Sequence, residues 1–204
     1  MNRIITIGRE FGSGGRELGK RLSELLGYAY YDKEIINEIA RRTSLAESYV
    51  QQVIEHKEKN FFPITVARTL HPVIGTLPND LVTTVYTEQA NVIREMAEKS
   101  DCIIIGRCAD YILSEFQPLR LFVYSDMNAK IVRCRQKSED GNGLSDRQLE
   151  KQIRQVDKSR ARYYNYYTGQ KWGDHENYDL CINTSSIAVK ECAEMLAHML
   201  DKRS

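Results

Sequence analysis

The chain has 204 residues, 42% of them hydrophobic, which is enough for one domain with an ordinary buried core. Its net charge of +1 excludes a broadly basic surface for nucleic acid or anionic membranes. No apolar run approaches the roughly 20 residues of a membrane helix, and the first apolar stretch ends at Gly8, so we expect a cytoplasmic protein. The five cysteines and four histidines share no metal-binding spacing, which favours reduced thiols and no protein-built metal site.

The first half of the chain alternates short apolar runs with helical patterns. In chain order it predicts a strand at 3–7, a helix at 16–27, a short strand at 28–32, a helix at 33–42 and a further helix after Ser44. Gly27 is a typical helix stop. Ser44 and Glu47 match a capping box, which predicts that the further helix starts there.

The second half begins with an irregular connection over residues 60–80, which carry three prolines and a glycine. There follow, in order, a helix at 81–99, strands at 101–106 and 119–124, a helix at 128–137, a helix from 145 to about 164, a strand at 178–182 and a helix at 186–200. Ser145 and Gln148 form a second capping-box pattern at the start of the long helix.

Near-continuous apolar strands separated by helices predict an α/β fold with a parallel sheet covered on both faces. Such sheets bind ligands at the carboxyl ends of their strands. The predicted strands therefore bring Gly8, Asp32, Gly106 and Ser125 to one edge of the sheet. This edge is where we expect the functional site.

The segment "TIGREFGSGGRE", residues 6–17, follows the first strand and opens the first helix, which makes its glycines informative. Gly8, Gly12, Gly14 and Gly15 allow positive φ and let backbone N–H groups approach phosphate oxygens. The helix N-terminus adds a partial positive charge. The segment predicts a phosphate-binding loop.

The strict pattern GxxxxGK followed by Ser or Thr is not met. Counted from Gly8, the loop is one residue too long, and Gly15 stands where the lysine is expected. We expect Arg16 to take the role of the lysine, with Arg9 as the second choice. Arg16 as a merely solvated residue at the helix start stays open as an alternative.

The Ser or Thr hydroxyl that usually binds Mg²⁺ shortly after the lysine is also missing. Glu17 stands there instead, and Ser13 is the only nearby hydroxyl. We expect Mg²⁺ to be held mostly by water and phosphate oxygens, with no metal ligands assigned to the protein.

In these motifs and three later segments, the chain resembles the cytidylate kinase-like family over residues 3 to about 200. The segments that carry the resemblance are "GREFGSGGRELGKRL", "YYDKEII", "CIIIGRCADYIL" and "VDKSRARYYNYYTGQKWGDHENYDLCINTS". The resemblance implies a three-layer P-loop NTPase fold in one domain, 1–204. It also implies a helical lobe for the nucleoside monophosphate, about 33–100, and a lid, about 133–175.

The implied reaction moves the γ-phosphoryl group of ATP, with Mg²⁺, to a nucleoside monophosphate such as CMP or dCMP. Gly12, Ser13 and Gly14 match the family's phosphate loop, whereas Gly15 departs from its lysine. The carry-over implies that Asp32 and Arg107 meet the acceptor nucleotide. Cys108 replaces the acidic residue that follows the arginine, and Asp110 stands two residues further on.

In the lid helix, Asp157 and Arg160 match the family's D-x-x-R pair, and Arg154 precedes them. Residues three apart on a helix are neighbours, so Asp157 can hold either arginine near the phosphates. Spacing alone favours a solvated helix with ion pairs, and the family resemblance reverses that preference. Arg133 falls where the lid begins, and Arg68 lies in the acceptor lobe, so both are further candidates for binding phosphate.

The stretch 162–172 interleaves aromatic and basic residues. Such a pattern can stack single-stranded nucleic acid, but the near-neutral chain favours packing of the lid hinge or contact with the second subunit of a homodimer. Two alternatives to the main hypothesis stay open. One is a kinase of another small molecule on the same fold, and the other is a nucleotide-binding regulatory protein that has lost catalysis.

Overall fold

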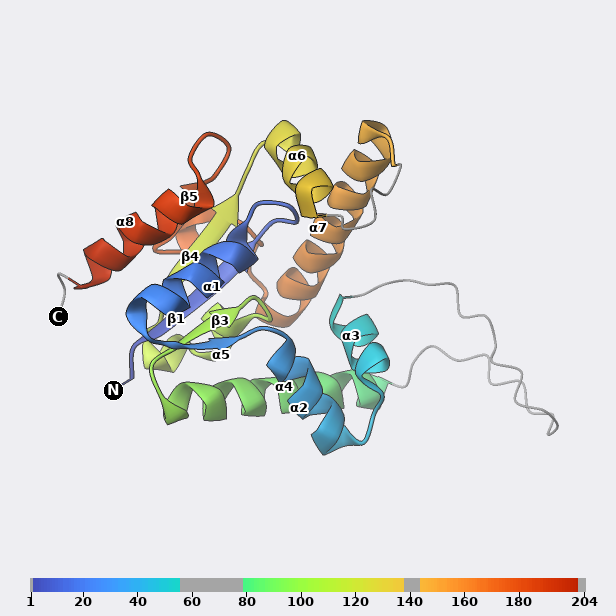
Figure 1. The fold of residues 1–204 in the computed structure, drawn as a ribbon. Helices are drawn as coiled ribbons and strands as arrows, with labels where there is room; N and C mark the ends of the chain where they lie inside the picture. The colour runs from blue at the N-terminus through green and yellow to red at the C-terminus, as the bar shows by residue number, and fades with distance from the viewer. Residues whose placement is uncertain (1, 56–78, 138–143, 202–204) are drawn as a thin grey trace, which may run out of the picture.

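The computed structural model describes residues 2–55, 79–137 and 144–201. Five strands within these residues form one parallel sheet in the spatial order β2-β3-β1-β4-β5. They are β1 (Ile4–Arg9), β2 (Ala29–Tyr31), β3 (Cys102–Ile105), β4 (Leu119–Tyr124) and β5 (Leu180–Asn183). Figure 1 shows β1 and β4 running through the middle of the molecule, and all strands end on the side of the glycine loop.

Helices connect the strands. They are α1 (Gly15–Leu26), α2 (Lys33–Thr43), α3 (Glu47–Glu55), α4 (Asn79–Lys99), α5 (Ala109–Ile112), α6 (Met127–Lys137), α7 (Asp146–Thr168) and α8 (Val189–Asp201). Two short 3-10 helices, Ser114–Phe116 and His175–Asn177, complete the described elements.

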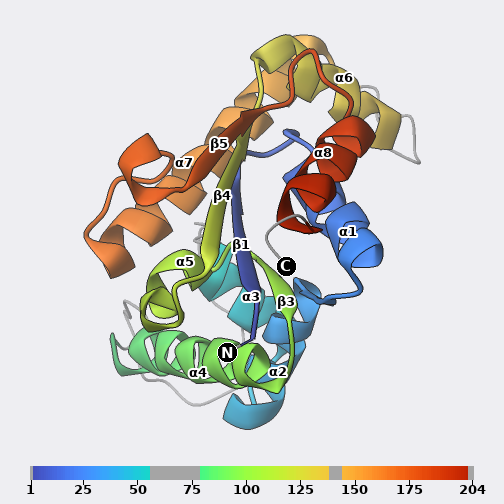
Figure 2. The same cartoon turned by 90° about the vertical axis from the view of Figure 1, so that its left-hand side faces the viewer.

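The strands bury side chains on both faces, which makes three layers. Ile5 and Ile7 pack with α1 and α8 on one face of the sheet, while Ile4 and Ile104 pack on the other face with α2 to α5. Residues that alternate along a strand point to opposite faces, so a continuous apolar strand needs cover on both sides. Figure 2 shows the strands between α1 and α8 on one side and α5 and α7 on the other.

Most predicted elements are confirmed. The strand at Leu119–Tyr124 has the predicted bounds, Gly27 ends α1 in a left-handed conformation, and Ser145 and Gln148 form the predicted capping box of α7. No helix of the described residues is long and apolar enough to cross a membrane. All five cysteines are free thiols. The predicted connection over 60–80 lies almost entirely outside the described residues.

Two predicted helix starts are wrong. Ser44 does not cap α3, because it ends α2 in a left-handed conformation (φ 55°), and the amides of Tyr49 and Val50 in α3 donate to the carbonyl of Ala46. Helix α8 begins at Val189 rather than at residue 186, because Asn183 and Ser185 hold the preceding residues in a turn. At the second place the Asn183 side chain accepts from the amide of Ser185, a local side-chain-to-backbone bond that competes with an earlier helix start.

Candidate functional site

The glycine loop joins the end of β1 to the start of α1 at the carboxyl edge of the sheet. Gly12 and Gly14 have φ of 75° and 84°, in the left-handed region that glycine adopts without strain. Gly14 is the N-cap residue of α1, so the first-turn amides that follow it lack partners within the helix. A Cβ on Gly14 would lie 2.6 Å from a methyl of Val189. The loop therefore needs glycine there and presents a helix N-terminus suited to an anion.

Helices α6 and α7 hold the outer part of the loop through a buried lysine. Lys130 of α6 places its Nζ 2.7 Å from Oε2 of Glu10 and 3.2 Å from Oδ2 of Asp157. The other oxygen of Asp157 accepts a hydrogen bond from the amide of Phe11 at 2.6 Å. Asp157 thus contacts the loop backbone and a lysine at the same time, rather than holding only an arginine of its own helix.

Arg160, one turn along α7, also contacts the loop. Its Nη1 donates to the carbonyl of Arg9 at 3.1 Å, and its guanidinium lies 5.7 Å from the ring centre of Phe11. Asp157 is 3.9 Å from Arg160, the outer limit of an ion pair. The predicted D-x-x-R pair therefore does meet the loop, with both residues on the same face of α7.

Arg133 supports the opposite side of the loop. Its Nη1 donates to the carbonyl of Gly12 at 3.3 Å and to the hydroxyl of Ser125 at 3.2 Å, and its Nη2 donates to the carbonyl of Thr184. The hydroxyl of Thr184 in turn donates to the carbonyl of Ser13 at 2.7 Å. These contacts join the loop to β4, α6 and the segment after β5.

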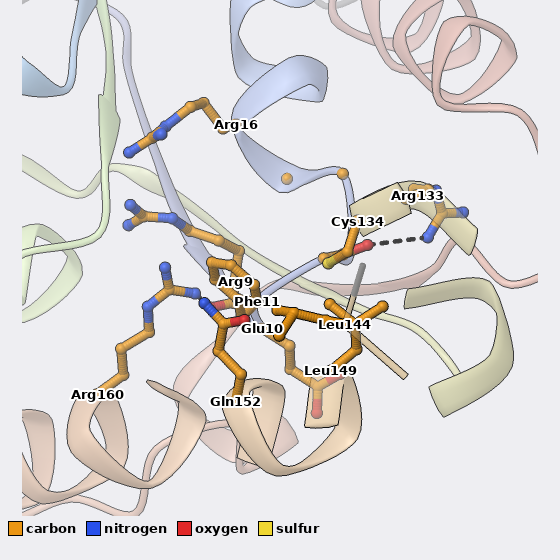
Figure 3. Close-up of a pocket in the computed structure, with 13 residues that line it drawn as sticks. Arg9, Glu10, Phe11, Arg16, Arg133, Cys134, Leu144, Leu149, Gln152 and Arg160 are labelled. Carbon is orange, nitrogen blue, oxygen red and sulfur yellow. Dashed lines mark hydrogen bonds between the residues drawn. The ribbon is translucent and has the colours of Figure 1, made fainter. Parts of the chain in front are cut away.

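A hollow of about 340 Å³ opens beside the loop, which is within the range of small-molecule sites. Figure 3 shows the side chains around it. Its lining comes from the glycine loop, α6 and α7: Arg9, Glu10, Phe11, Gly12, Gly14, Gly15, Arg16, Arg133, Cys134, Leu144, Leu149, Gln152 and Arg160. The polar half of this lining is mainly cationic, so the hollow suits an anionic ligand.

A second hollow lies on the other side of the loop, at the end of β3. It is lined by Gly8, Arg9, Arg16, Ile54, Gly106, Arg107, Cys108, Asp110, Arg160, Tyr163, Tyr164, Trp172 and Tyr178. Three arginines, Arg9, Arg16 and Arg160, line both hollows. In Figure 3 the guanidinium of Arg9 lies between those of the other two. A ligand that reaches from one hollow to the other has to pass these three groups.

Asp32 is the carboxylate that the described structure places against Arg9 and Arg16. Its Oδ2 lies 2.6 Å from Nε of Arg16, and its Oδ1 lies 3.6 Å from Nη2 of Arg9. Burial, and then the charge of Arg160, lower the pKa of Arg9 despite the opposing effect of Asp32. Among the described residues, the three guanidinium groups outnumber the carboxylates that pair with them, which are Asp32 and, at 3.9 Å, Asp157, so a net positive charge here favours binding of an anion.

The far wall of the second hollow is aromatic with one buried acid. The hydroxyl of Tyr164 donates to Asp110 at 2.6 Å, and burial raises the pKa of this carboxyl above its ordinary value. Gln89 is fully buried, donates to the carbonyl of Arg107 at 3.0 Å and accepts from Tyr163 at 3.1 Å. The wall is therefore held in place by hydrogen bonds and offers aromatic surface beside one carboxyl group.

The described residues contain no cluster of three or more histidine, cysteine or acidic side chains that could hold a metal ion. Ser13 is buried and its hydroxyl donates to the carbonyl of Glu10 at 2.9 Å. Glu17 pairs with Arg21 at 3.0 Å and lines neither hollow. The two side chains nearest the usual magnesium position, Ser13 and Glu17, therefore line neither hollow.

The structure brings together most of the site residues predicted from the sequence. Two predicted site residues lie elsewhere: Arg154 is two-thirds exposed and pairs with Glu150 on the outer face of α7, and Glu17 pairs with Arg21 and lines neither hollow. Arg68 lies outside the described residues. Sequence reasoning missed Lys130, whose partners lie far from it in the chain, and gave no role to Glu10 and Phe11 although both stand in the glycine loop.

Comparisons with known proteins find relatives over nearly the whole chain. The model of the cytidylate kinase-like family matches residues 4–186. A protein named cytidylate kinase from Desulfurococcus amylolyticus is 24% identical over 192 residues, which are 94% of this chain and 89% of that protein. Another of the same name from Thermoplasma acidophilum is 23% identical, over 98% of this chain and 93% of that protein.

Solved structures show the same architecture. An uncharacterized protein from Eubacterium ventriosum has a TM-score of 0.70 and 28% identity, over 98% of this chain and 99% of that one. Shikimate kinase from Acinetobacter baumannii has a TM-score of 0.53 and 16% identity, over 100% of this chain and 95% of that one. Together with the strand order, these matches confirm the predicted P-loop NTPase fold.

Proposed function

Because the chain belongs to the cytidylate kinase-like family, we propose that it transfers the γ-phosphoryl group of ATP to a nucleoside monophosphate, CMP or dCMP. One observation carries the proposal. Two hollows flank the glycine loop, and Arg9, Arg16 and Arg160 line both of them. A donor in one hollow and an acceptor in the other would meet at a cluster of positive charge, which is the arrangement that phosphoryl transfer requires.

The hollow beside the loop is the proposed donor site. First-turn amides of α1 and the left-handed glycines provide N–H donors for the phosphates of ATP. Arg133 already donates to the carbonyl of Gly12 in the loop and to the carbonyl of Thr184 after β5. It would therefore hold the loop in shape, and through its position in the lining it would add charge beside the nucleotide.

The second hollow is the proposed acceptor site. Arg107 lines it next to the three shared arginines and is suited to the monophosphate, because a guanidinium binds phosphate oxygens in pairs. Asp110 and the aromatic wall lie further along the same lining. A carboxylate can accept a hydrogen bond from the exocyclic amine of cytosine, which is the chemical basis for a CMP or dCMP acceptor.

The chemistry asks the protein for positioning and charge rather than for a covalent intermediate. The transferring group passes from an oxygen of ATP to an oxygen of the acceptor phosphate, and the guanidinium groups offset the negative charge on its oxygens. Mg²⁺, which would be bound by the phosphates and water, supplies further neutralisation of that charge. Asp157 accepts from a loop amide, and Lys130 pairs with Asp157 and with the side chain of Glu10, so both residues keep the loop in place during this step.

A coupled assay of ADP release, run with ATP, Mg²⁺ and each nucleoside monophosphate in turn, tests the proposal. We expect turnover with CMP and dCMP, and a raised KM for these acceptors in Asp110→Asn. Turnover with another monophosphate would correct the acceptor and keep the reaction. Silence with every monophosphate would refute the proposal, and calorimetric binding of ATP in the same sample would then favour a regulatory protein or a kinase with a different acceptor.

A further inference from the structure

The register of the glycine loop is best counted from Arg9 rather than from Gly8. Strand β1 extends through Arg9, which pairs with Val123 of β4. From Arg9, the pattern GxxxxGK has its usual length and ends at Gly15. The loop is therefore not one residue too long. It has an arginine at the first glycine position of the pattern and a glycine at the lysine position.

Arg9 and Gly15, the two positions at which the loop departs from the GxxxxGK pattern, lie against each other. A Cβ built on Gly15 would lie 2.6 Å from Cβ and 3.2 Å from Cγ of Arg9, and 3.2 Å from Cβ of Val123. Distances below 3.0 Å to a Cβ atom require the backbone to move, so a side chain at position 15 and the arginine at position 9 exclude one another. Gly15 has no positive φ, so its backbone does not require glycine and the reason for glycine is steric.

The side chain of Arg9 extends to the place where the two hollows meet. Its Nη1 lies over Gly106 at the end of β3, where an added Cβ would overlap it. The side chain of Arg9 is 13% exposed, whereas that of Arg16 is 58% exposed and is held 1.0 Å closer to Asp32, at 2.6 against 3.6 Å. A charge that is shielded from water interacts more strongly with a neighbouring anion than a solvated one.

We propose that Arg9 supplies the cation that binds the donor phosphates in place of the missing lysine, and that Gly15 is required because it leaves room for Arg9. This inference rests on the proposed function, since it assigns a residue to the same site. Burial and the charge of Arg160 also lower the pKa of Arg9, so a bound polyphosphate would relieve repulsion that the free site carries.

Substitutions at positions 9 and 15 test the inference. Arg9→Met removes the charge and keeps most of the side-chain volume, and we expect kcat/KM for ATP to fall about 100-fold or more, as for other groups that stabilise charge in the transition state. Gly15→Lys alone is expected to be as impaired, because it collides with Arg9. The double variant Arg9→Gly with Gly15→Lys restores the GxxxxGK pattern and is expected to recover at least about tenfold over Arg9→Gly.

Three further variants make the result specific. Arg9→Lys keeps a cation and should retain more activity than Arg9→Met. Arg16→Met should lose less than Arg9→Met, because Arg16 is exposed and paired. Arg41→Met is the matched surface control, since Arg41 is 71% exposed, pairs with Glu38 and lies on α2 away from both hollows. Thermal unfolding by circular dichroism identifies any variant that is not folded.

Wild-type kcat/KM in folded Arg9→Met would overturn the inference, as would a folded double variant no better than Arg9→Gly. Calorimetric titration with ATP and with pyrophosphate separates this inference from the proposed function, because it needs no acceptor. If ATP binding depends on Arg9 but no monophosphate is phosphorylated, the proposed function fails and the role of Arg9 stands. If turnover is present and independent of Arg9, the role of Arg9 fails alone.

Discussion

Replacing Asp157 with alanine would detach the glycine loop from helix α7. The carboxylate accepts from the amide of Phe11 at 2.6 Å and from Lys130 at 3.2 Å, and its side chain is 15% exposed. Lys130 is 6% exposed and would keep Glu10, at 2.7 Å, as its remaining partner. The variant therefore leaves the amide of Phe11 without its acceptor. It also leaves the buried ammonium of Lys130 with one of its two carboxylate partners.

The expected magnitude follows from these contacts. A hydrogen bond to a charged group contributes about 1.5–3 kcal/mol, and an amide left without a partner away from water costs about 1–3 kcal/mol. The two free energies are not added together, because both describe the loss of the same hydrogen bond between Asp157 and Phe11. Burial raises the pKa of Asp157 despite its contacts with Phe11 and Lys130, so desolvation limits the net contribution of the charged carboxylate. We therefore expect a loss of about 2–3 kcal/mol in unfolding free energy, or a Tm lower by about 4–12 °C for a chain of this size.

Urea denaturation and calorimetry of the wild type, Asp157→Ala and Asp157→Asn measure this loss. The asparagine variant keeps an acceptor for Phe11 and removes the charge that faces Lys130, so it should lie between the other two. Glu150→Ala is the control on the same helix, because its pair with Arg154 is exposed and should contribute less than about 0.5 kcal/mol. A loss in Asp157→Ala as small as that of the control would refute the attachment of the loop to α7.

Three further predictions concern separate features. Gly106→Ala should lower kcat/KM at least about tenfold, because the new methyl displaces Arg9, whereas Gly27→Ala, with a similar φ of 70° and nothing within 4 Å, should keep normal kinetics. Ser145→Ala removes the capping box of α7 and should lower the unfolding free energy by about 1 kcal/mol in urea melts, with Ser145→Thr close to wild type. Two neighbouring arginines hold the pKa of Glu38 at about 2, below its ordinary 4.5, so this carboxylate stabilises the fold above pH 4.5 and stops doing so as the pH falls towards 2. The destabilisation caused by Glu38→Gln should accordingly shrink between pH 7 and pH 3, and an effect that stays constant would contradict the assigned pairing.

Local sequence patterns were sufficient for most of the fold. Leu119–Tyr124 is a run of leucine, phenylalanine, valine and tyrosine interrupted only by Arg120; its centre is buried, and its bounds were predicted to the residue. The glycine loop was recognised because it stands between a strand and a helix, where few other structures use four glycines. Ser44 shows the limit of a local pattern, since the same side chain can end one helix or cap the next and only packing decides which.

The site was predictable in its residues but not in its contacts. Lys130 meets Glu10 and Asp157, which are 120 and 27 residues away, so no window of sequence contains the three together. The steric exclusion between Arg9 and Gly15 also appears only in three dimensions, although both residues stand in one quoted motif. Sequence reasoning ranked Arg16 above Arg9 by closeness to the lysine position, whereas the geometry favours the more buried of the two.

A crystal structure with a bisubstrate analogue, adenosine and cytidine joined through a pentaphosphate, would test the account most directly. The account predicts that one molecule occupies both hollows, with its phosphates on the loop amides and against Arg9, Arg16 and Arg160. An analogue bound with its phosphates away from the glycine loop, or no binding at all in solution, would contradict it.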